Sequence, residues 1–282
     1  MADNTSNLEL RRTWESAASG WAKWEGVFSA GLSDVTDTLI DMAAIRFGMR
    51  VLDVACGAGS QSIQAAKRVG PTGSVVASDI SATMLDHVRQ NAIRAGLQNI
   101  ETLECAAEDV AEARVLFDAS ISRLGLMLFP SPRGALEAVL RVLRPGARFA
   151  ALVFTTPENN PFMARPRAIL LRHAGKSPDA PGQPGIFALG GDRILDNLIQ
   201  DCGMADVKTK TVRAPLNLES AADALQMMQQ AFGGSRAVVA DLSDADKSKA
   251  WDEVYECLQQ FEGRRGFETE FEFIIGSGAK PT

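Results

Sequence analysis

The stretch VLDVACGAGS, from Val51 to Ser60, decides the fold of this 282-residue chain. An apolar run here leads into Asp53 and then into a Gly-Ala-Gly turn at which a helix can begin. Gly57 and Gly59 let the backbone turn tightly and approach a ligand, because no Cβ stands in the way. A second acid, Asp79, ends the next apolar run, and an acid at such a place can accept both hydroxyls of a ribose. The layout therefore predicts a nucleoside pocket.

The glycine turn departs from a dinucleotide fingerprint. Such a fingerprint needs a third small residue, glycine or alanine, so that the helix packs closely and its bare amides hold a pyrophosphate. Here that position is Ser62. The negative charge of Asp53 beside the turn would repel phosphate, but it would suit a ligand that carries an ammonium and a sulfonium. An NAD(P)-dependent oxidoreductase on a Rossmann-like sheet is therefore the disfavoured alternative.

Apolar strands and amphipathic helices alternate over the first half of the chain. Ser81 is placed to N-cap the helix that carries Met84, and a helix over residues 136–143 would end at Pro145 and Gly146. Such alternation indicates a parallel sheet with helices on both faces. We expect its first five strands at residues 49–54, 73–79, 99–105, 117–122 and 148–155.

The second half of the chain lacks this regular alternation of strands and helices. Residues 156–191 are rich in proline and glycine and are too long for a simple connection. A helix near 192–202, a strand at 207–212, helices near 220–231 and 243–261, and the alternating stretch GFETEFEFIIG follow. We expect one domain over residues 31–282, with a substrate cap drawn from 156–191 and 215–262.

The glycine turn and the two acids resemble those of class I S-adenosylmethionine-dependent methyltransferases, and the resemblance covers roughly residues 10–155. CAAEDV, from Cys105, is similar to the loop that brackets adenine in this family. FDASISRLGLMLFP, from Phe117, is similar to the fourth strand and the loop behind the methyl group. The segments WESAASGWAKW and SRLGLMLFPSP most resemble the ubiquinone/menaquinone C-methyltransferase-like (methyltransferase type 11) group, whose members alkylate small molecules. The resemblance implies a Rossmann-like seven-stranded mixed sheet whose last strand runs antiparallel between the fifth and sixth.

The resemblance also implies which residues hold S-adenosylmethionine, whose product would be S-adenosylhomocysteine. Asp53 would bind the ammonium group directly or through water, and Asp79 would bind the ribose hydroxyls. The family usually has an aspartate where this chain has Ala106, so a carboxylate contact to the adenine amino group must come from Glu108 or Asp109, or be absent. The expected cofactor-binding residues are Asp53, Ala55, Gly57, Gly59, Asp79, Ile80, Met84, Ala107, Glu108 and Ser122.

Two residues are candidates for catalysis. Arg123 follows the fourth strand, at the sheet edge where ligands collect, so it would bind the methionine carboxylate or an acidic substrate, or else be a surface charge. His173 in the cap region could act as a general base, although an exposed histidine is the common alternative. If neither acts, the nucleophile must already be reactive. The acceptor atom, a carbon, oxygen or nitrogen of a natural-product or quinone-like molecule, therefore stays open.

Three tryptophans lie in residues 1–30, namely Trp14, Trp21 and Trp24. By resemblance, this segment is a helical lid that folds over cofactor and substrate. An aromatic face near the sulfonium would add a cation–π interaction of about 0.5 to 2 kcal/mol. Ordinary helix packing is the alternative role for these rings.

Composition narrows the class of partner. The net charge is −6, with no sustained basic stripe, so a nucleic-acid substrate is not expected. The N-terminus lacks an apolar signal core, and no run approaches the roughly 18 apolar residues of a membrane span, so we expect a cytoplasmic protein with no membrane contact. The four cysteines lack C-x-x-C spacing, and no metal is expected. A non-catalytic S-adenosylmethionine-binding protein stays an alternative, and the oligomeric state is open, a homodimer included.

Overall fold

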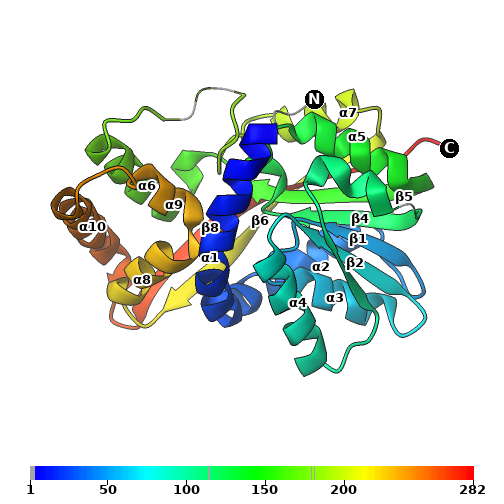
Figure 1. Ribbon diagram of the computed structural model, residues 1–282, viewed down its shortest axis with the longest axis horizontal. Helices are drawn as coiled ribbons and strands as arrows, with labels where there is room; N and C mark the ends of the chain where they lie inside the picture. Colours follow the sequence, from blue (N-terminus) through cyan, green and yellow to red (C-terminus); the bar gives the residue numbers. More distant parts are fainter. Residues whose placement is uncertain (1–3, 114, 179, 181) are drawn as a thin grey trace.

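The computed structural model describes residues 4–113, 115–178, 180 and 182–282, and a twisted sheet lies at its centre (Figure 1). The strand order is β3-β2-β1-β4-β5-β8-β6. The strands are β1 Arg50–Val54, β2 Ser74–Asp79, β3 Ile100–Glu104, β4 Phe117–Arg123, β5 Leu143–Phe154, β6 Ala205–Leu218, β7 Glu262–Gly263 and β8 Gly266–Ala279. Strands β1 to β5 pair in parallel, and β8 pairs antiparallel with both β5 and β6. The predicted Rossmann-like fold is confirmed, and the two-residue β7 is an unpredicted eighth strand that pairs with β8.

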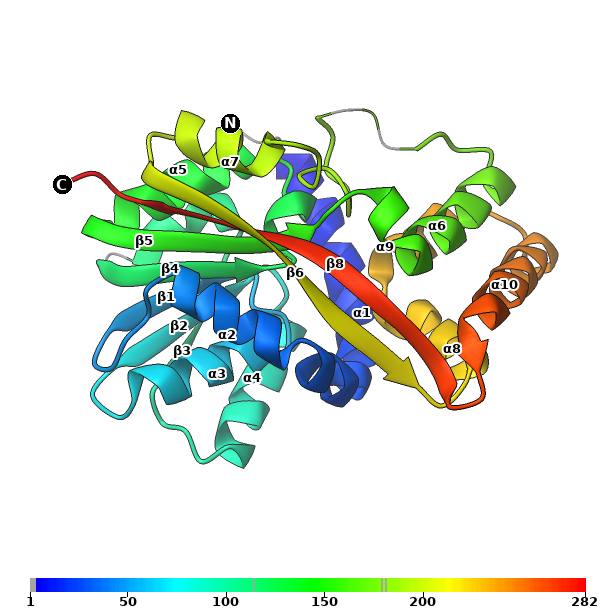
Figure 2. The same cartoon turned by 180° about the vertical axis from the view of Figure 1, so that it is seen from behind.

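Helices cover both faces of the sheet (Figure 2). On one face lie α2 Ser33–Met42, α3 Ser60–Val69 and α4 Ala82–Arg94; on the other lie α5 Pro132–Val142 and α7 Ile194–Asp201. Because both faces are covered, the central strands are continuous apolar runs, and Val51, Leu52 and Val75 are fully buried. The predicted N-cap of α4 is present, since the Ser81 hydroxyl accepts a hydrogen bond from the Met84 amide at 3.1 Å.

One helix boundary differs from the sequence prediction. Helix α5 ends at Val142, and β5 begins at once, so Pro145 and Gly146 lie in the strand rather than at the helix end. The pairing register of β5 with β4 shifts between Leu143 and Arg148, which marks a bulge. A bulge leaves residues outside the regular ladder and can accept a proline that has no amide hydrogen. Pro145 therefore lies in an irregular part of strand β5 instead of ending a helix.

A second lobe surrounds the long strands β6 and β8. Each has 14 residues, against five in β1, and their far ends project beyond the parallel strands (Figure 2). Around these ends pack α6 Pro161–His173, α8 Ala221–Ala231, α9 Gly233–Val238 and α10 Asp244–Leu258. We call these four helices and the projecting strand ends the cap lobe. Neither α6 nor α9 was predicted, and Pro161 is compatible with a helix because it occupies the first turn.

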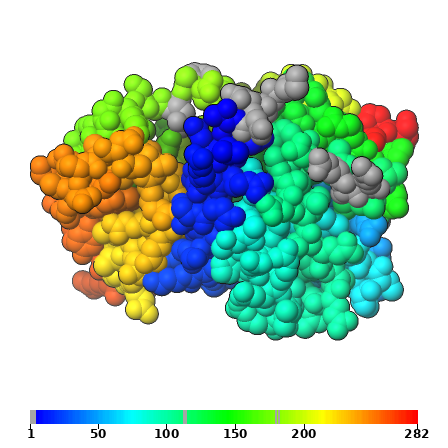
Figure 3. Space-filling view, in the orientation of Figure 1, coloured from blue at the N-terminus to red at the C-terminus, as the bar shows by residue number. Residues whose placement is uncertain are grey.

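Helix α1, Asn4–Gly31, lies between the core and the cap lobe (Figure 1). On the core side, the Glu15 carboxylate accepts a hydrogen bond from the Thr83 amide of α4 at 3.4 Å. On the cap side, a Cβ at Gly20 would lie 2.0 Å from the carbonyl oxygen of Gln230, so only glycine allows α8 to approach this closely. Figure 3 shows α1 exposed along one side between the two lobes. No helix in the described part of the chain is long and apolar enough to cross a membrane.

Candidate active site

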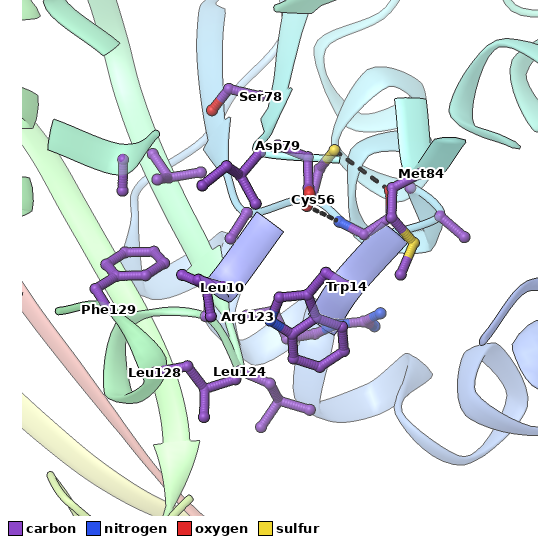
Figure 4. A pocket seen from close by; sticks show the side chains of 18 of the residues that line it. Leu10, Trp14, Cys56, Ser78, Asp79, Met84, Arg123, Leu124, Leu128 and Phe129 are labelled. Atoms are coloured by element: carbon purple, nitrogen blue, oxygen red, sulfur yellow. Dashed lines mark hydrogen bonds between the residues drawn. The ribbon is translucent and has the colours of Figure 1, made fainter. Parts of the chain in front are cut away.

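A cavity opens at the carboxyl ends of β1, β2 and β4 and is covered by α1. We call it the sheet-edge cavity; it holds about 850 Å³ of space, its open mouth included. Figure 4 shows Asp79, Met84, Arg123 and Trp14 around this space. Eleven of the sequence-predicted residues line it, namely Trp14, Trp21, Ala55, Gly57, Gly59, Asp79, Ile80, Met84, Ala107, Glu108 and Arg123.

The glycine turn takes the conformation that its sequence predicts. Gly57 and Gly59 have φ values of 55° and 91°, in the left-handed region that favours glycine. The Asp79 carboxylate accepts hydrogen bonds from the amides of Gly57 and Ser81, each at 2.9 Å. Asp79 therefore ties the turn after β1 to the end of β2. A carboxylate has about four acceptor sites, so capacity remains for the hydroxyls of a ligand.

Two loops with strained backbone meet at the floor of the cavity. Ala55 and Leu124 line it with φ values of 57° and 63°, although neither is glycine. Such outliers persist only where the surrounding structure imposes them, and they cluster at functional sites. A Cβ at Gly125 would lie 2.6 Å from that of Ala55, so Gly125 is required for the contact. Sequence reasoning missed Gly125, whose only signal is its place in the segment SRLGLMLFP.

Asp53 lies behind the turn and does not line the cavity. Its carboxylate accepts a hydrogen bond from the Ser62 hydroxyl at 2.5 Å and a longer one from the Gln61 amide at 3.5 Å. Complete burial raises the pKa of Asp53 to about 7, against the opposing effects of the Ser62 hydrogen bond and of the Arg123 charge. The contact of Asp53 with a ligand ammonium, directly or through water, stays a prediction, and this placement favours contact through water.

Arg123 is buried, and it faces the cavity rather than the surface. Its guanidinium donates hydrogen bonds to the hydroxyl oxygens of Thr36 at 2.9 Å and Ser60 at 2.5 Å. Burial lowers the pKa of Arg123, and the charges of Glu25 and Asp53 oppose that shift. Arg123 is thus a fixed positive charge at one end of the cavity, next to the N-terminus of α3.

Glu25 is a cavity residue that sequence reasoning missed. It lies on α1, one helical turn beyond Trp21, and lines the sheet-edge cavity. Burial raises the pKa of Glu25, and the positive charge of Arg123 opposes the shift. No motif contains Glu25, so only the packing of α1 over the sheet edge identifies it.

The other end of the cavity is bounded by Ile80, Met84, Ala107 and Glu108. One carboxylate oxygen of Glu108 is buried without a hydrogen-bond partner among the described residues. Burial raises the pKa of Glu108. This end therefore offers an apolar slot with one acceptor oxygen, which matches a flat heteroaromatic ring that carries an amino group.

A second cavity adjoins the first under the cap lobe. We call it the cap cavity; it holds about 790 Å³, and its walls are mostly apolar. The described residues that line it are Trp14, Trp21, Phe28, Leu32, Leu124, Met127, Leu128, Phe154, Met163, Arg167, Ile186, Phe232, Gly233, Gly234, Ser235, Phe271 and Phe273. Trp14, Trp21, Leu124 and Leu128 line both cavities. These four side chains therefore form a shared wall across which two ligands would meet.

Besides Asp53, three predicted site residues line neither cavity. Trp24 donates its indole hydrogen to the Gln230 amide oxygen at 2.9 Å, on the side of α1 that contacts α8. His173 lies at the end of α6, with its Nε2 2.8 Å from a carboxylate oxygen of Glu253, so it does not reach a ligand in either cavity. Ser122 is buried at the end of β4, beneath the backbone of Gly125. Within the described ranges, no group of three or more His, Cys, Asp or Glu residues could hold a metal ion.

Comparison with known families identifies the core. The ubiE/COQ5 methyltransferase family matches residues 4–168, from α1 through the parallel strands into α6. The chain belongs to this family. The predicted relationship to class I methyltransferases is confirmed, and the NAD(P)-dependent alternative loses its support.

The relatives match different shares of the chain. The ubiquinone/menaquinone biosynthesis C-methyltransferase UbiE of Pseudomonas fluorescens is 33% identical over 153 residues, which span 54% of this chain and 60% of that enzyme. A phosphoethanolamine N-methyltransferase from Haemonchus contortus, solved with S-adenosylhomocysteine, has a TM-score of 0.59 at 14% identity and covers 98% of this chain and 61% of its own. The [4+2]-cyclase SpnF has a TM-score of 0.56 at 13% identity and covers 94% and 95%. These structural likenesses show the fold alone, since a cyclase shares it.

Proposed function

We propose that this protein is an S-adenosylmethionine-dependent methyltransferase that methylates a carbon of an apolar, quinone-like aromatic molecule. The observation that carries the proposal is the shared wall of Trp14, Trp21, Leu124 and Leu128. It separates a cavity with acids, a fixed guanidinium and a glycine turn from one lined mainly by apolar rings. Two reactants held on either side of such a wall are close enough to meet in a near-attack arrangement.

The sheet-edge cavity fits S-adenosylmethionine at both ends. Asp79 would accept the ribose hydroxyls, and the unpartnered oxygen of Glu108 would accept the adenine amino group. The backbone of Ala55, Gly57 and Gly59 would lie along the methionine part, where no Cβ of the glycines intervenes. When bound, the cofactor supplies a methyl group on a sulfonium and leaves as S-adenosylhomocysteine.

The cap cavity fits the acceptor. Its rings, among them Phe154, Phe232 and Phe271, offer stacking and apolar contact to a flat aromatic molecule. The names of the relatives, which concern ubiquinone and menaquinone, agree with an acceptor of that class. Methylation of a ring carbon forms a carbon–carbon bond and releases the ring proton. Since His173 lies elsewhere, we infer that an electron-rich hydroquinone ring supplies the reactivity, and that the protein mainly orients it and excludes water.

The two peripheral segments complete this proposal. Residues 1–30 would act as a lid, because α1 covers both cavities and contacts the core and the cap lobe. Residues 156–191 and 215–262 would act as the substrate cap. A small-molecule acceptor, a cytoplasmic location and the absence of a nucleic-acid partner are parts of the same hypothesis.

The proposal is tested first by binding and then by turnover. Calorimetry should show micromolar binding of S-adenosylmethionine and no binding of NAD. Labelled methyl groups should then pass from the cofactor to hydroquinones in a panel that also contains phenols and amines. Tight NAD binding would restore the oxidoreductase alternative, whereas cofactor binding without transfer to any panel member would favour a non-catalytic binding protein.

A further inference from the structure

Glu25 is a half-buried acid that lines the sheet-edge cavity. Both of its carboxylate oxygens are buried and neither makes a hydrogen bond of regular geometry with a described residue, although the Ser60 hydroxyl lies near enough to oppose the rise of the Glu25 pKa. An acceptor buried without a partner is costly, and a buried charge more so. A carboxylate in this state indicates a partner that the protein chain itself does not supply.

The surroundings of Glu25 define that partner. The positive charge of Arg123 acts on the pKa of Glu25, but the hydrogen bonds of Arg123 go to the hydroxyls of Thr36 and Ser60. One helical turn away along α1, the Trp21 indole nitrogen is 3.5 Å from the position that a Cβ on Gly57 would take. Glu25 therefore lies above the glycine turn, at the end of the cavity away from Glu108.

Asp53 is not available for the same task. Its carboxylate is already engaged by the Ser62 hydroxyl, and it lies outside the cavity wall. A ligand with an ammonium group that binds over the glycine turn would thus find Glu25 as the carboxylate that faces it. An ammonium group has three donors and no acceptor, which suits a carboxylate that keeps free acceptor capacity.

We propose that Glu25 of helix α1 binds the α-ammonium group of S-adenosylmethionine, while Arg123 holds its carboxylate. This inference rests on the proposed function. It places one charge of the site on the covering helix and the other on the sheet, so the amino-acid end of the cofactor joins the two. A charge-assisted hydrogen bond of this kind makes cofactor binding depend on the position of α1.

Three ligands separate the ammonium from the rest of the cofactor. S-adenosylmethionine has both the ammonium and the carboxylate, decarboxylated S-adenosylmethionine keeps only the ammonium, and methylthioadenosine lacks both. Because methylthioadenosine also lacks the sulfonium, S-adenosylhomocysteine, which keeps the ammonium and the carboxylate without the sulfonium, should be weakened as S-adenosylmethionine is. Calorimetry should show that Glu25→Gln binds the first two about 10- to 150-fold more weakly than the parent protein does. Affinity for methylthioadenosine should not change.

The control variant is Glu108→Ala, which removes the acceptor oxygen at the adenine end of the same cavity. It should weaken all three ligands alike, because all three carry adenine. Glu25→Asp keeps the charge on a shorter side chain and should regain part of the affinity for the two ammonium ligands.

Each other result overturns the assignment. Loss of affinity for S-adenosylmethionine alone would show that Glu25 acts through Arg123 on the carboxylate. Equal weakening of all three ligands would show that Glu25 only supports the cavity, and three unchanged affinities would show that it has no role. If the parent protein binds none of the three ligands, the proposed function itself fails.

Discussion

The two cavities are built from different parts of the sequence. Most of the sheet-edge cavity comes from short loops that follow consecutive parallel strands, together with one face of α1. The cap cavity instead gathers residues from Trp14 to Phe273, on α1, β5, α6, α9 and β8. A cavity at strand ends is a consequence of the parallel sheet itself, whereas the cap cavity exists only because distant helices pack together.

The two cavities also differ in the number of charged side chains that line them. The sheet-edge cavity holds Glu25, Asp79, Glu108 and Arg123, while the described lining of the cap cavity has one charged side chain, Arg167. Polar groups in fixed positions select one ligand, and apolar walls accept a class of ligands. The family would then share a cofactor and vary in acceptor, and the following variants test that division.

The largest effect is expected from Asp79→Ala. This change removes the hydrogen bonds to the amides of Gly57 and Ser81 as well as the acceptors for ribose. Since each charge-assisted hydrogen bond contributes about 1.5 to 3 kcal/mol, S-adenosylmethionine affinity should fall at least about 100-fold by calorimetry. An affinity within threefold of that of the parent protein would contradict the role of the sheet-edge cavity.

A side chain that fills the cap cavity should impair the acceptor and spare the cofactor, the reverse of what Asp79→Ala should do. A Cβ at Gly234 meets no atom within 4 Å, so a side chain there can extend into the cavity without a clash at its base. Gly234→Phe should raise the KM for the acceptor or lower kcat/KM at least about tenfold, and S-adenosylmethionine affinity should stay within twofold. Gly234→Ala is the matched control, with kinetics near those of the parent protein. If Gly234→Phe weakened the cofactor and spared the acceptor, the two cavities would have been assigned the wrong way round.

The tryptophans of α1 test the shared wall. Trp21 lines both cavities, so Trp21→Ala should lower turnover by about 10- to 100-fold, because the reactants lose their alignment. Trp24 contacts Gln230 instead, so Trp24→Ala should reduce the free energy of unfolding by about 1 to 3 kcal/mol with near-normal turnover in the folded protein. Each variant loses one indole ring, so measuring denaturation and kinetics on both compares changes of equal size at two positions. Equal turnover in the two variants would mean that Trp21 only packs against its neighbours and does not align the reactants.

The same contrast explains what the sequence could predict. Gly57, Gly59 and Asp79 lie within 30 residues, and their geometry follows from one turn between two neighbouring strands. The N-cap at Ser81 is equally local. The resemblance supplied the place of the last strand, antiparallel between the fifth and sixth, which the alternation of strands and helices alone leaves open. The parallel sheet then placed Arg123 at the ligand edge.

The sequence could not predict which side chains of α1 and α6 face the cavities, because the orientation of each helix depends on contacts with distant parts of the chain. The rotation of α1 is set by Thr83 on the core and Gln230 on the cap lobe, so nothing local shows that Trp21 and Glu25 face the ligand while Trp24 does not. His173 is directed away from the cavities because α6 packs on α10, a contact between segments about 80 residues apart.

The smallest effect concerns pH and the acids behind and around the sheet-edge cavity. Burial raises the pKa of Asp53 to about 7, so between its unfolded value and this one the native state binds more protons than the unfolded state. Stability of the ligand-free protein should therefore fall as pH rises toward 7, by about 1 kcal/mol from Asp53 between pH 6 and pH 8. Burial shifts the pKa of Asp79 and of Glu25 in the same direction, so the contributions of these two acids to stability also decrease as the pH rises.

Asp53→Asn isolates this contribution, because the amide keeps an acceptor for the Ser62 hydroxyl but does not titrate. Urea denaturation at pH 6 and pH 8 should show a smaller loss of unfolding free energy in the variant than in the parent protein. A filled cap cavity, as in Gly234→Phe, should leave the pH dependence of the parent unchanged, since Gly234 does not line the acidic cavity. Identical slopes in the parent and Asp53→Asn would mean that Asp53 stays ionised in the folded protein, with Ser62 and Arg123 outweighing its burial.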